Sequence, residues 1–228
     1  MIAGICKARN EGHILKQTLD NWATYCDRIH IYDDCSQDST PDIAHEHPAV
    51  VEVVTSDYLD PDRLRAEWYN RNLILQSAMR FKPEWVAYFD ADEWIYGFDT
   101  DLLKNKNMVS IRSDLYDVHI TPEDIGPGER EWVDPAPRLI PFFFRHPIGF
   151  EYPDQRIMNH HRCGGIAHSG KVKHWGKGWS EDIWERKVEY YGTQFGRYAD
   201  KWKARKGKAV KHDFKSDFGQ PLARFDEI

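Results

Sequence analysis

Residues 85–93 read WVAYFDADE, a run of five apolar residues followed by Asp90, Asp92 and Glu93. A short apolar run rich in aromatic and β-branched residues indicates a strand buried on both faces, which is typical of a parallel sheet covered by helices. In such sheets, ligands bind beyond the carboxyl ends of the strands. The stretch therefore predicts an α/β fold and also the edge of the sheet at which a site would lie.

The chain before this stretch alternates between strand and helix patterns. Apolar β-type runs occupy residues 2–6, 29–32 and 50–55, and helical patterns occupy residues 14–25 and 63–81, with a helix start at residues 38–41. Repeated strand–helix–strand units predict a mostly parallel central sheet with helices on both faces.

The chain after this stretch is less regular. Residues 114–137 are rich in Pro, Gly, Asp and Glu and predict loops around short strands at 109–112 and 139–144. From Trp184 to Trp202, apolar residues recur at spacings of three and four, which predicts one face of a helix that packs on the core. Gly192 and Gly196 interrupt this stripe, so a break or a close approach of another segment is expected there.

Composition narrows the class of protein. The 228 residues carry a net charge of −6 with a mean hydropathy of −0.70, which excludes a nucleic-acid binder held by general positive charge. The chain has no apolar run of about 18 residues and no signal-peptide pattern at its start, so we expect a soluble cytoplasmic protein. Its 4 cysteines form no C-x-x-C pair and are expected to be free thiols.

Positive charge is concentrated late in the chain. Residues 171–211 hold 12 Lys and Arg against 5 Asp and Glu, a net +7, so the remainder carries −13. Such a region could face a phosphate-bearing ligand or make peripheral contact with an anionic membrane surface. A solvated helix face is the alternative interpretation.

Polar side chains follow three predicted strands. The candidates are Lys7, Arg9, Asn10 and Glu11 after the first, Asp33 and Asp34 after the second, and Asp90 and Asp92 after the strand at 85–89. Paired carboxylates are costly to bury unless a cation lies between them, and hard oxygen ligands favour Mg²⁺ or Mn²⁺ held together with a substrate's phosphates. The D-x-D triplet therefore suggests a metal–diphosphate site.

These motifs together resemble the family-2-like nucleotide-sugar glycosyltransferases of GT-A fold. The resemblance rests on the strand leading to Asn10-Glu11, the D-D-x-S-x-D-x-T segment at 33–40, Arg71-Asn72 on a helix, and Asp90-Ala91-Asp92-Glu93. It covers about residues 1–100, and more loosely the His-Trp-Gly at 174–176. It implies one transferase domain over 1–228, with a nucleotide-sugar half at 1–100, an acceptor half at 101–180 and a C-terminal helical segment at 181–228.

The resemblance also implies roles for individual residues. Asp33 or Asp34 would read a uracil-type base, and the residues around the donor would be Lys7, Arg9, Asn10, Glu11 and Arg71. Asp90 would hold the ribose or the metal. Asp92 and a late histidine, His174, would complete the Mn²⁺ or Mg²⁺ site. The donor would be a nucleoside-diphosphate sugar, such as a UDP-sugar, and the acceptor a hydroxyl of a glycan or glycoconjugate. The base that deprotonates this hydroxyl in an inverting reaction would be Asp154, which follows a turn-forming proline, or Glu151.

Two other functions fit parts of the pattern. An apolar strand followed by D-x-D also opens phosphohydrolase sites, in which Asp90 would be a nucleophile. A non-catalytic carbohydrate-binding protein could use the aromatic residues, which make up 14% of the chain, to stack on sugars.

Overall fold

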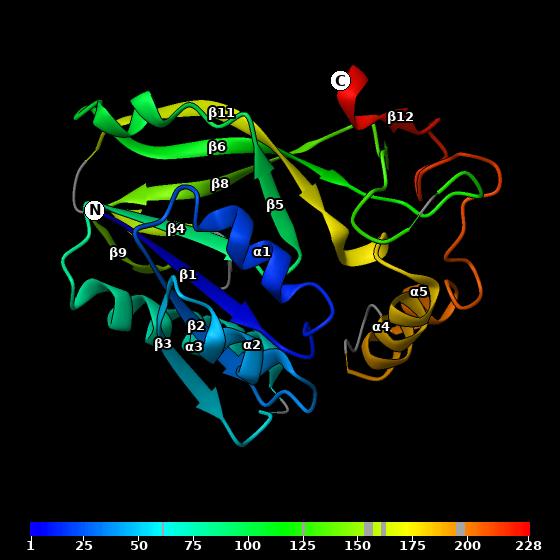
Figure 1. The fold of residues 1–228 in the computed structure, drawn as a ribbon, viewed down its shortest axis with the longest axis horizontal. Helices are drawn as coiled ribbons and strands as arrows, with labels where there is room; N and C mark the ends of the chain where they lie inside the picture. Colours follow the sequence, from blue (N-terminus) through cyan, green and yellow to red (C-terminus); the bar gives the residue numbers. More distant parts are fainter. Residues whose placement is uncertain (61, 125, 153–156, 161–162, 195–198) are drawn as a thin grey trace. The chain divides into compact units, whose positions relative to one another are not determined.

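One eight-stranded sheet organises this computed structural model, which describes residues 1–60, 62–124, 126–152, 157–160, 163–194 and 199–228 (Figure 1). Contacts divide the chain into two compact units. The first unit comprises Met1–Asp114 and Leu139–Lys171, and the second comprises Leu115–Arg138 and Val172–Ile228.

The sheet runs in the order β3-β2-β1-β4-β8-β6-β11-β5. The strands are β1 (Ile2–Ala8), β2 (Arg28–Asp34), β3 (Val50–Ser56), β4 (Trp85–Asp90), β5 (Glu93–Tyr96), β6 (Met108–Asp117), β8 (Arg138–Arg145) and β11 (Gly165–His174). β1 pairs in parallel with both β2 and β4, and β2 pairs in parallel with β3, whereas β8 is antiparallel to β4. Strand order therefore reverses between β1 and β4, where their carboxyl ends lie side by side.

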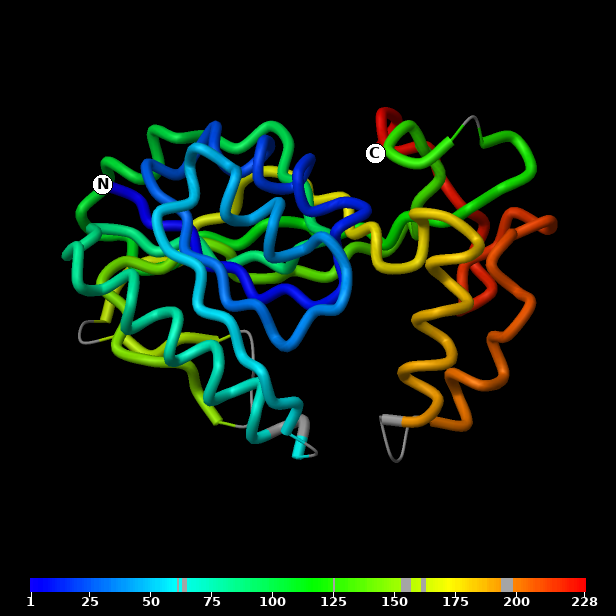
Figure 2. Tube along the Cα trace, turned by 60° about the horizontal axis from the view of Figure 1, so that its bottom comes forward, coloured from blue at the N-terminus to red at the C-terminus, as the bar shows by residue number. Residues whose placement is uncertain are grey.

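Helices cover both faces of the parallel strands. Successive residues of a strand point to opposite sides, so strands that are apolar throughout need cover on each face. The helices of this unit are α1 (Leu15–Trp22), α2 (Thr40–Glu46) and α3 (Arg63–Met79), with a 3₁₀ turn η1 at Thr100–Lys104. Figure 2 shows α1 and α3 on opposite sides of the sheet. The strand β9 (Pro147–Phe150) pairs with β10 (Met158–His160) in a separate hairpin.

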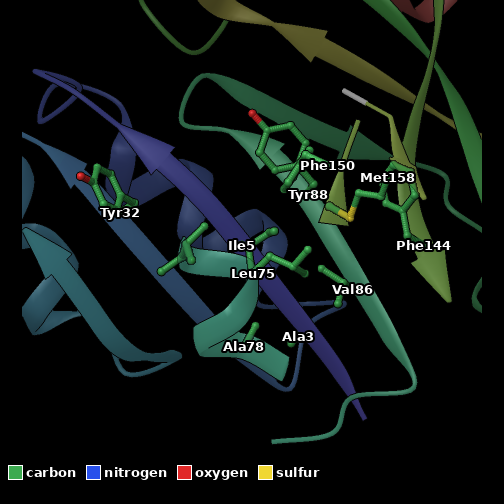
Figure 3. Close-up of a cluster of buried hydrophobic side chains, with 11 residues drawn as sticks. Ala3, Ile5, Tyr32, Leu75, Ala78, Val86, Tyr88, Phe144, Phe150 and Met158 are labelled. Atoms are coloured by element: carbon green, nitrogen blue, oxygen red, sulfur yellow. The ribbon is translucent and has the colours of Figure 1, made fainter. Parts of the chain in front are cut away.

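The face toward α3 is an apolar layer drawn in Figure 3. Ala3 and Ile5 of β1 pack with Leu75 and Ala78 of α3, and Tyr88 continues the layer on β4. Together with the other members of this cluster, these buried side chains fix α3 against β1, β2 and β4.

The opposite face is held by an aromatic stack. Trp22 of α1 lies 4.4 Å from Phe89 of β4, centroid to centroid, with the rings nearly parallel. Gly4 of β1 allows this packing, since a Cβ atom there would lie 3.1 Å from both the Cys26 sulfur and the Phe89 ring. The small residue therefore marks a close approach rather than a turn.

In the second unit, a continuous helix from Trp184 to Trp202 is wrong, whereas the close approach of another segment expected at its glycines is confirmed at Gly192. The structure has α4 (Glu181–Gln194) and α5 (Ala199–Lys203), which lie side by side in Figures 1 and 2. The rings of Trp184 and Trp202 are 6.3 Å apart, whereas 18 residues of one helix would separate them by about 27 Å. At Gly192, a Cβ atom would lie 3.1 Å from the Lys203 side chain, so the glycine permits the close approach of α5.

The rest of the second unit has little regular structure. It contains β7 (Trp132–Val133) paired with β12 (Ala223–Arg224), and the 3₁₀ turns η2 (Trp175–Lys177) and η4 (Phe225–Glu227). Ile120 and Ala209 pack against α4 in a small core of their own.

The predicted α/β fold with parallel strands and helices on both faces is confirmed. The division into donor, acceptor and C-terminal segments within one domain stays a prediction. Among the described helices, none has the length and apolar character needed to cross a bilayer. The four cysteines are free, as expected.

Candidate functional site

The ends of β1, β2 and β4 bring the main candidates together. In the parallel register, Lys7 lies beside Tyr32 on one side and Asp90 on the other, and the next residue of β1 lies beside Asp33. Polar residues that are 26 to 83 positions apart in the sequence thus meet at one edge of the sheet, as predicted from the strand ends.

An ion-pair network lies on the face toward α3. The Lys7 ammonium is 2.8 Å from Asp34 Oδ2 and 2.5 Å from Glu67 Oε1, and Arg71 is 3.3 Å from the other Glu67 oxygen. These four side chains are at most 14% exposed, so the pairs are only weakly screened by water. Asn70 adds a hydrogen bond to Asp34 Oδ1 at 3.3 Å. The network fixes two cations at the strand ends.

Asp90 is the point at which this network reaches solvent. Its Oδ1 accepts a hydrogen bond from the Tyr88 hydroxyl at 2.7 Å and lies 3.6 Å from the Arg71 guanidinium. Arg71 is also 4.9 Å from the centre of the Tyr88 ring, which orients the guanidinium. The Asp90 side chain is 29% exposed and can therefore meet a ligand.

Asp33 points to the opposite face from Asp34 because the two are neighbours on one strand. Asp33 is 1% exposed, and its Oδ2 accepts a 3.4 Å hydrogen bond from the Ser36 amide. Within the described residues its Oδ1 has no hydrogen-bond partner. Burial raises the pKa of Asp33, and the negative charges of Asp34 and Asp38 raise it further. An unsatisfied buried carboxylate oxygen marks a place for a donor from a ligand.

Acidic side chains gather around the end of β1. The pKa of the buried Cys6 thiol is raised first by burial, and then by the charges of Asp90, Glu93, Asp92 and Glu11. Asp92 and Glu93 are both buried, and Glu93 accepts a 2.8 Å hydrogen bond from the Asp90 amide. So much negative charge in a buried region favours a bound cation.

Helix α1 holds the backbone of this acidic segment from the side. The Thr18 hydroxyl donates to the Ala91 carbonyl at 2.6 Å, and the Trp22 indole donates to the Glu93 carbonyl at 2.7 Å. Asn21 makes two hydrogen bonds with the Ile95 backbone, at 2.8 and 3.0 Å. These contacts fix the path of the chain through residues 91–95.

The loops after β1 and β2 are joined to one another. Arg9 donates to the Asp34 carbonyl at 2.8 Å, the Asn10 amide donates to Ser36 Oγ at 2.9 Å, and the Glu11 amide donates to Thr40 Oγ1 at 2.8 Å. Asn10 adopts a left-handed φ of 53°, a conformation that asparagine tolerates. Arg9, Asn10 and Glu11 therefore have structural partners in addition to their predicted role around the donor.

Three further predicted site residues are His174, Glu151 and Asp154. His174 belongs to the second unit, where its Nδ1 lies 2.5 Å from Asp117 Oδ1. Glu151 is exposed, and Asp154 lies outside the described residues. Across the described chain, no three His, Cys, Asp or Glu side chains are arranged to hold a metal ion. The parts played by His174, Glu151 and Asp154 stay predictions.

Two residues were missed by the sequence analysis. Glu67 bridges Lys7 and Arg71, and its spacing of four residues from Arg71 on a predicted helix was a usable signal. His119 is buried in the second unit among charged residues distant in sequence, and no local pattern indicates it.

The chain is similar to two curated proteins, and no family model matches it. Both relatives carry the description "Uncharacterized protein", one from Mycobacterium bovis and one from Mycobacterium tuberculosis. Each is 32% identical over 191 residues, which is 75% of this chain and 43% of the relative. The chain thus spans less than half the length of these relatives.

Solved structures show partial similarity of fold. A glucosyl-3-phosphoglycerate synthase from Mycobacterium tuberculosis with phosphoglyceric acid is 20% identical, with a TM-score of 0.37 over 50% of this chain and 44% of that one. The same enzyme with Mn²⁺, uridine diphosphate and phosphoglyceric acid is 18% identical, with a TM-score of 0.35 over 50% and 43%. A 4-diphosphocytidyl-2C-methyl-D-erythritol synthase is 12% identical, with a TM-score of 0.37 over 63% and 74%.

Proposed function

We propose that the protein is a metal-dependent glycosyltransferase that moves a sugar from a nucleoside-diphosphate donor to an acceptor hydroxyl. The observation that carries the proposal is the adjacency of three parallel strand ends that carry the buried Asp33, with its unsatisfied oxygen, and Asp90, which the buried Asp92 follows by two residues. A carboxylate acceptor for a base and an acidic site for a cation are the two features that a nucleotide donor requires.

Asp33, rather than Asp34, is proposed to read the base. Asp34 already accepts from Lys7 and Asn70, whereas Asp33 has a carboxylate oxygen that can accept the imide N–H of a uracil-type base. A base that donates to this oxygen would satisfy a buried group that otherwise lowers stability.

The diphosphate is proposed to lie between the cations and the acidic pair. Lys7 and Arg71 supply positive charge next to Asp90. A Mg²⁺ or Mn²⁺ ion typically uses one or two carboxylates and completes its shell with water and phosphate, so Asp90 and Asp92 suit it without a third protein ligand. When bound, such an ion would neutralise the charge that develops on the departing diphosphate.

The acceptor side is assigned less completely. An inverting reaction needs a carboxylate that removes the acceptor proton on the face of the sugar opposite the departing diphosphate. Glu151 and Asp154 are the proposed bases, and His174 is the proposed further metal ligand. The contacts of Asp90 with Tyr88 and Arg71 favour a positioning role for this carboxylate over the nucleophile of a phosphohydrolase.

A thermal-shift experiment with UDP, in the presence and absence of Mn²⁺, tests the proposal. At a ligand concentration of about 100 times Kd, binding stabilises the folded state by about 2.7 kcal/mol, which raises the Tm by about 5 to 10 °C for a chain of this size. Asp92→Asn should remove the Mn²⁺-dependent part of the shift. Asp101→Asn, the same change at an exposed position, should retain it.

Two results would contradict the proposal. One is a folded wild-type protein that shows no shift with any nucleoside diphosphate. The other is a shift that both variants retain in full, since binding would then be independent of the acidic pair.

A further inference from the structure

Asp217 in the second unit is surrounded by three cations. Its carboxylate lies 2.9 Å from the Lys177 ammonium, 2.8 Å from the Arg205 guanidinium and 2.6 Å from the Lys211 ammonium. The side chains of the three cations are 13 to 16% exposed. One carboxylate cannot balance three positive charges at a site from which water is largely excluded.

Asp117 does not remove this excess of charge. It lies 3.2 Å from the same Lys177 and 2.7 Å from Arg138, and it also contacts His174 at 2.5 Å. Within the described residues, four Lys and Arg side chains thus share two aspartates, which leaves a net charge of +2 on these six side chains. We call Asp117, Asp217 and these four cations the cation cluster.

The cations of the cluster have hydrogen-bond donors to spare. Lys211 has three N–H donors and Arg205 has five. In the described chain, each of these side chains donates one hydrogen bond, and both bonds are accepted by Asp217. Lys177 donates to one oxygen of each aspartate. A ligand with several acceptor oxygens could use the remaining donors without displacing an aspartate.

His119 gives an independent indication of a ligand. It is 1% exposed, and its Nε2 is buried with no hydrogen-bond partner in the described parts of the chain. His119 follows Asp117 of the cluster by two residues, and burial together with the charges of Lys177 and Lys211 lowers its pKa. A buried ring nitrogen without a partner is costly, and a hydrogen bond to a ligand would remove that cost.

We propose that the cation cluster, with His119, binds a phosphate group of a small soluble phosphomonoester. A phosphate ester carries a charge of about −1.5 to −2 near neutral pH and has three strong acceptor oxygens, which matches the net +2 and the spare donors. A phosphate of a membrane lipid has the same chemistry. However, the three cations around Asp217 are only 13 to 16% exposed and are poorly placed to meet headgroups on a flat surface, which favours the small molecule. Arg138, which pairs with Asp117, is 54% exposed. The site does not depend on the proposed transferase activity.

Calorimetric titration of the whole protein with inorganic phosphate and with glycerol phosphate, against chloride at equal ionic strength, tests the proposal. Wild-type protein should bind both phosphates. Lys211→Gln should weaken this binding by about tenfold, equal to 1.4 kcal/mol. Lys206→Gln, the same change at a neighbouring exposed position, should leave it unchanged. Vesicles of phosphatidylcholine with phosphatidic acid should not bind.

The proposal is overturned if phosphate binds no better than chloride, if the two lysine variants lose affinity equally, or if only the vesicles bind. A measurement on the wild type avoids any folding defect of a variant. The imidazole NMR signals of His119 should shift during the phosphate titration, and unchanged signals would also refute the site. Asp217→Asn should tighten phosphate binding because it removes a competing negative charge, and unchanged or weaker binding would contradict the proposal.

Discussion

His119 should make the stability of the protein depend on pH between about 6.5 and about 4. Burial lowers the pKa of this histidine from 6.5 to about 4, with Lys177 and Lys211 lowering it and Asp217 and Asp117 opposing them. The folded-state pKa is depressed, so in this window the unfolded chain binds a proton that the folded chain does not. The resulting stability is complete above about pH 6.5 and is lost as the pH falls toward 4. At 1.36 kcal/mol per pKa unit, the loss amounts to about 3 kcal/mol.

Urea unfolding at about pH 7.5 and about pH 4.5 measures this contribution. Wild-type protein should lose about 2 to 3 kcal/mol more than His119→Gln between the two conditions. His45→Gln, at an exposed position of α2, should behave as the wild type, which controls for the other histidines. If His119→Gln and the wild type lose the same free energy of unfolding, His119 is not held neutral by burial and the reasoning fails.

Three further substitutions test the site and the sheet beneath it. Asp33→Asn should stabilise the ligand-free protein by about 0.5 to 2 kcal/mol at neutral pH, because it removes the charge of a buried carboxyl group whose pKa is raised. The same change should abolish the thermal shift with UDP. Lower stability in urea would contradict this reasoning. Glu67→Gln should lower stability by about 2 kcal/mol, because Lys7 and Arg71 lose a carboxylate partner. It should nevertheless tighten UDP binding in calorimetry. Glu46→Gln, at an exposed position, should change neither quantity. Gly4→Ala should cost about 1 to 3 kcal/mol in urea unfolding, since its methyl group would crowd the layer under α1, and wild-type stability would show that this layer can relax.

Much of the first unit could be predicted because its signals are local. The apolar run at 85–89 became β4, and the helical segment predicted at 63–81 became α3, ending two residues earlier at Met79. The strand ends then placed Lys7 and Asp90 side by side, since parallel strands share one edge. Periodicity and the geometry of parallel sheets are sufficient for this part.

Other features could not be predicted because they depend on tertiary contacts. Asp33 and Asp34 are equivalent in the motif, and the register of β1 against β2 decides which of them is paired with Lys7. The apolar stripe from Trp184 to Trp202 is continuous in the sequence because both helices have an apolar face. These faces pack against each other, with Trp202 of α5 in contact with Trp184 of α4. The cation cluster joins residues from 117 to 217, and no pattern of spacing links such distant positions.

The hydrogen bonds from α1 to the backbone of residues 91–95 affect the thermodynamics of binding. Thr18, Asn21 and Trp22 fix the chain that carries Asp92 by contacts that involve neither a nucleotide nor a cation. A segment that is already ordered loses little conformational entropy when a ligand arrives, so more of the interaction energy is available as affinity. Helix α1 thus contributes to ligand affinity through preorganisation, although these three side chains are directed to the backbone and not to the ligand.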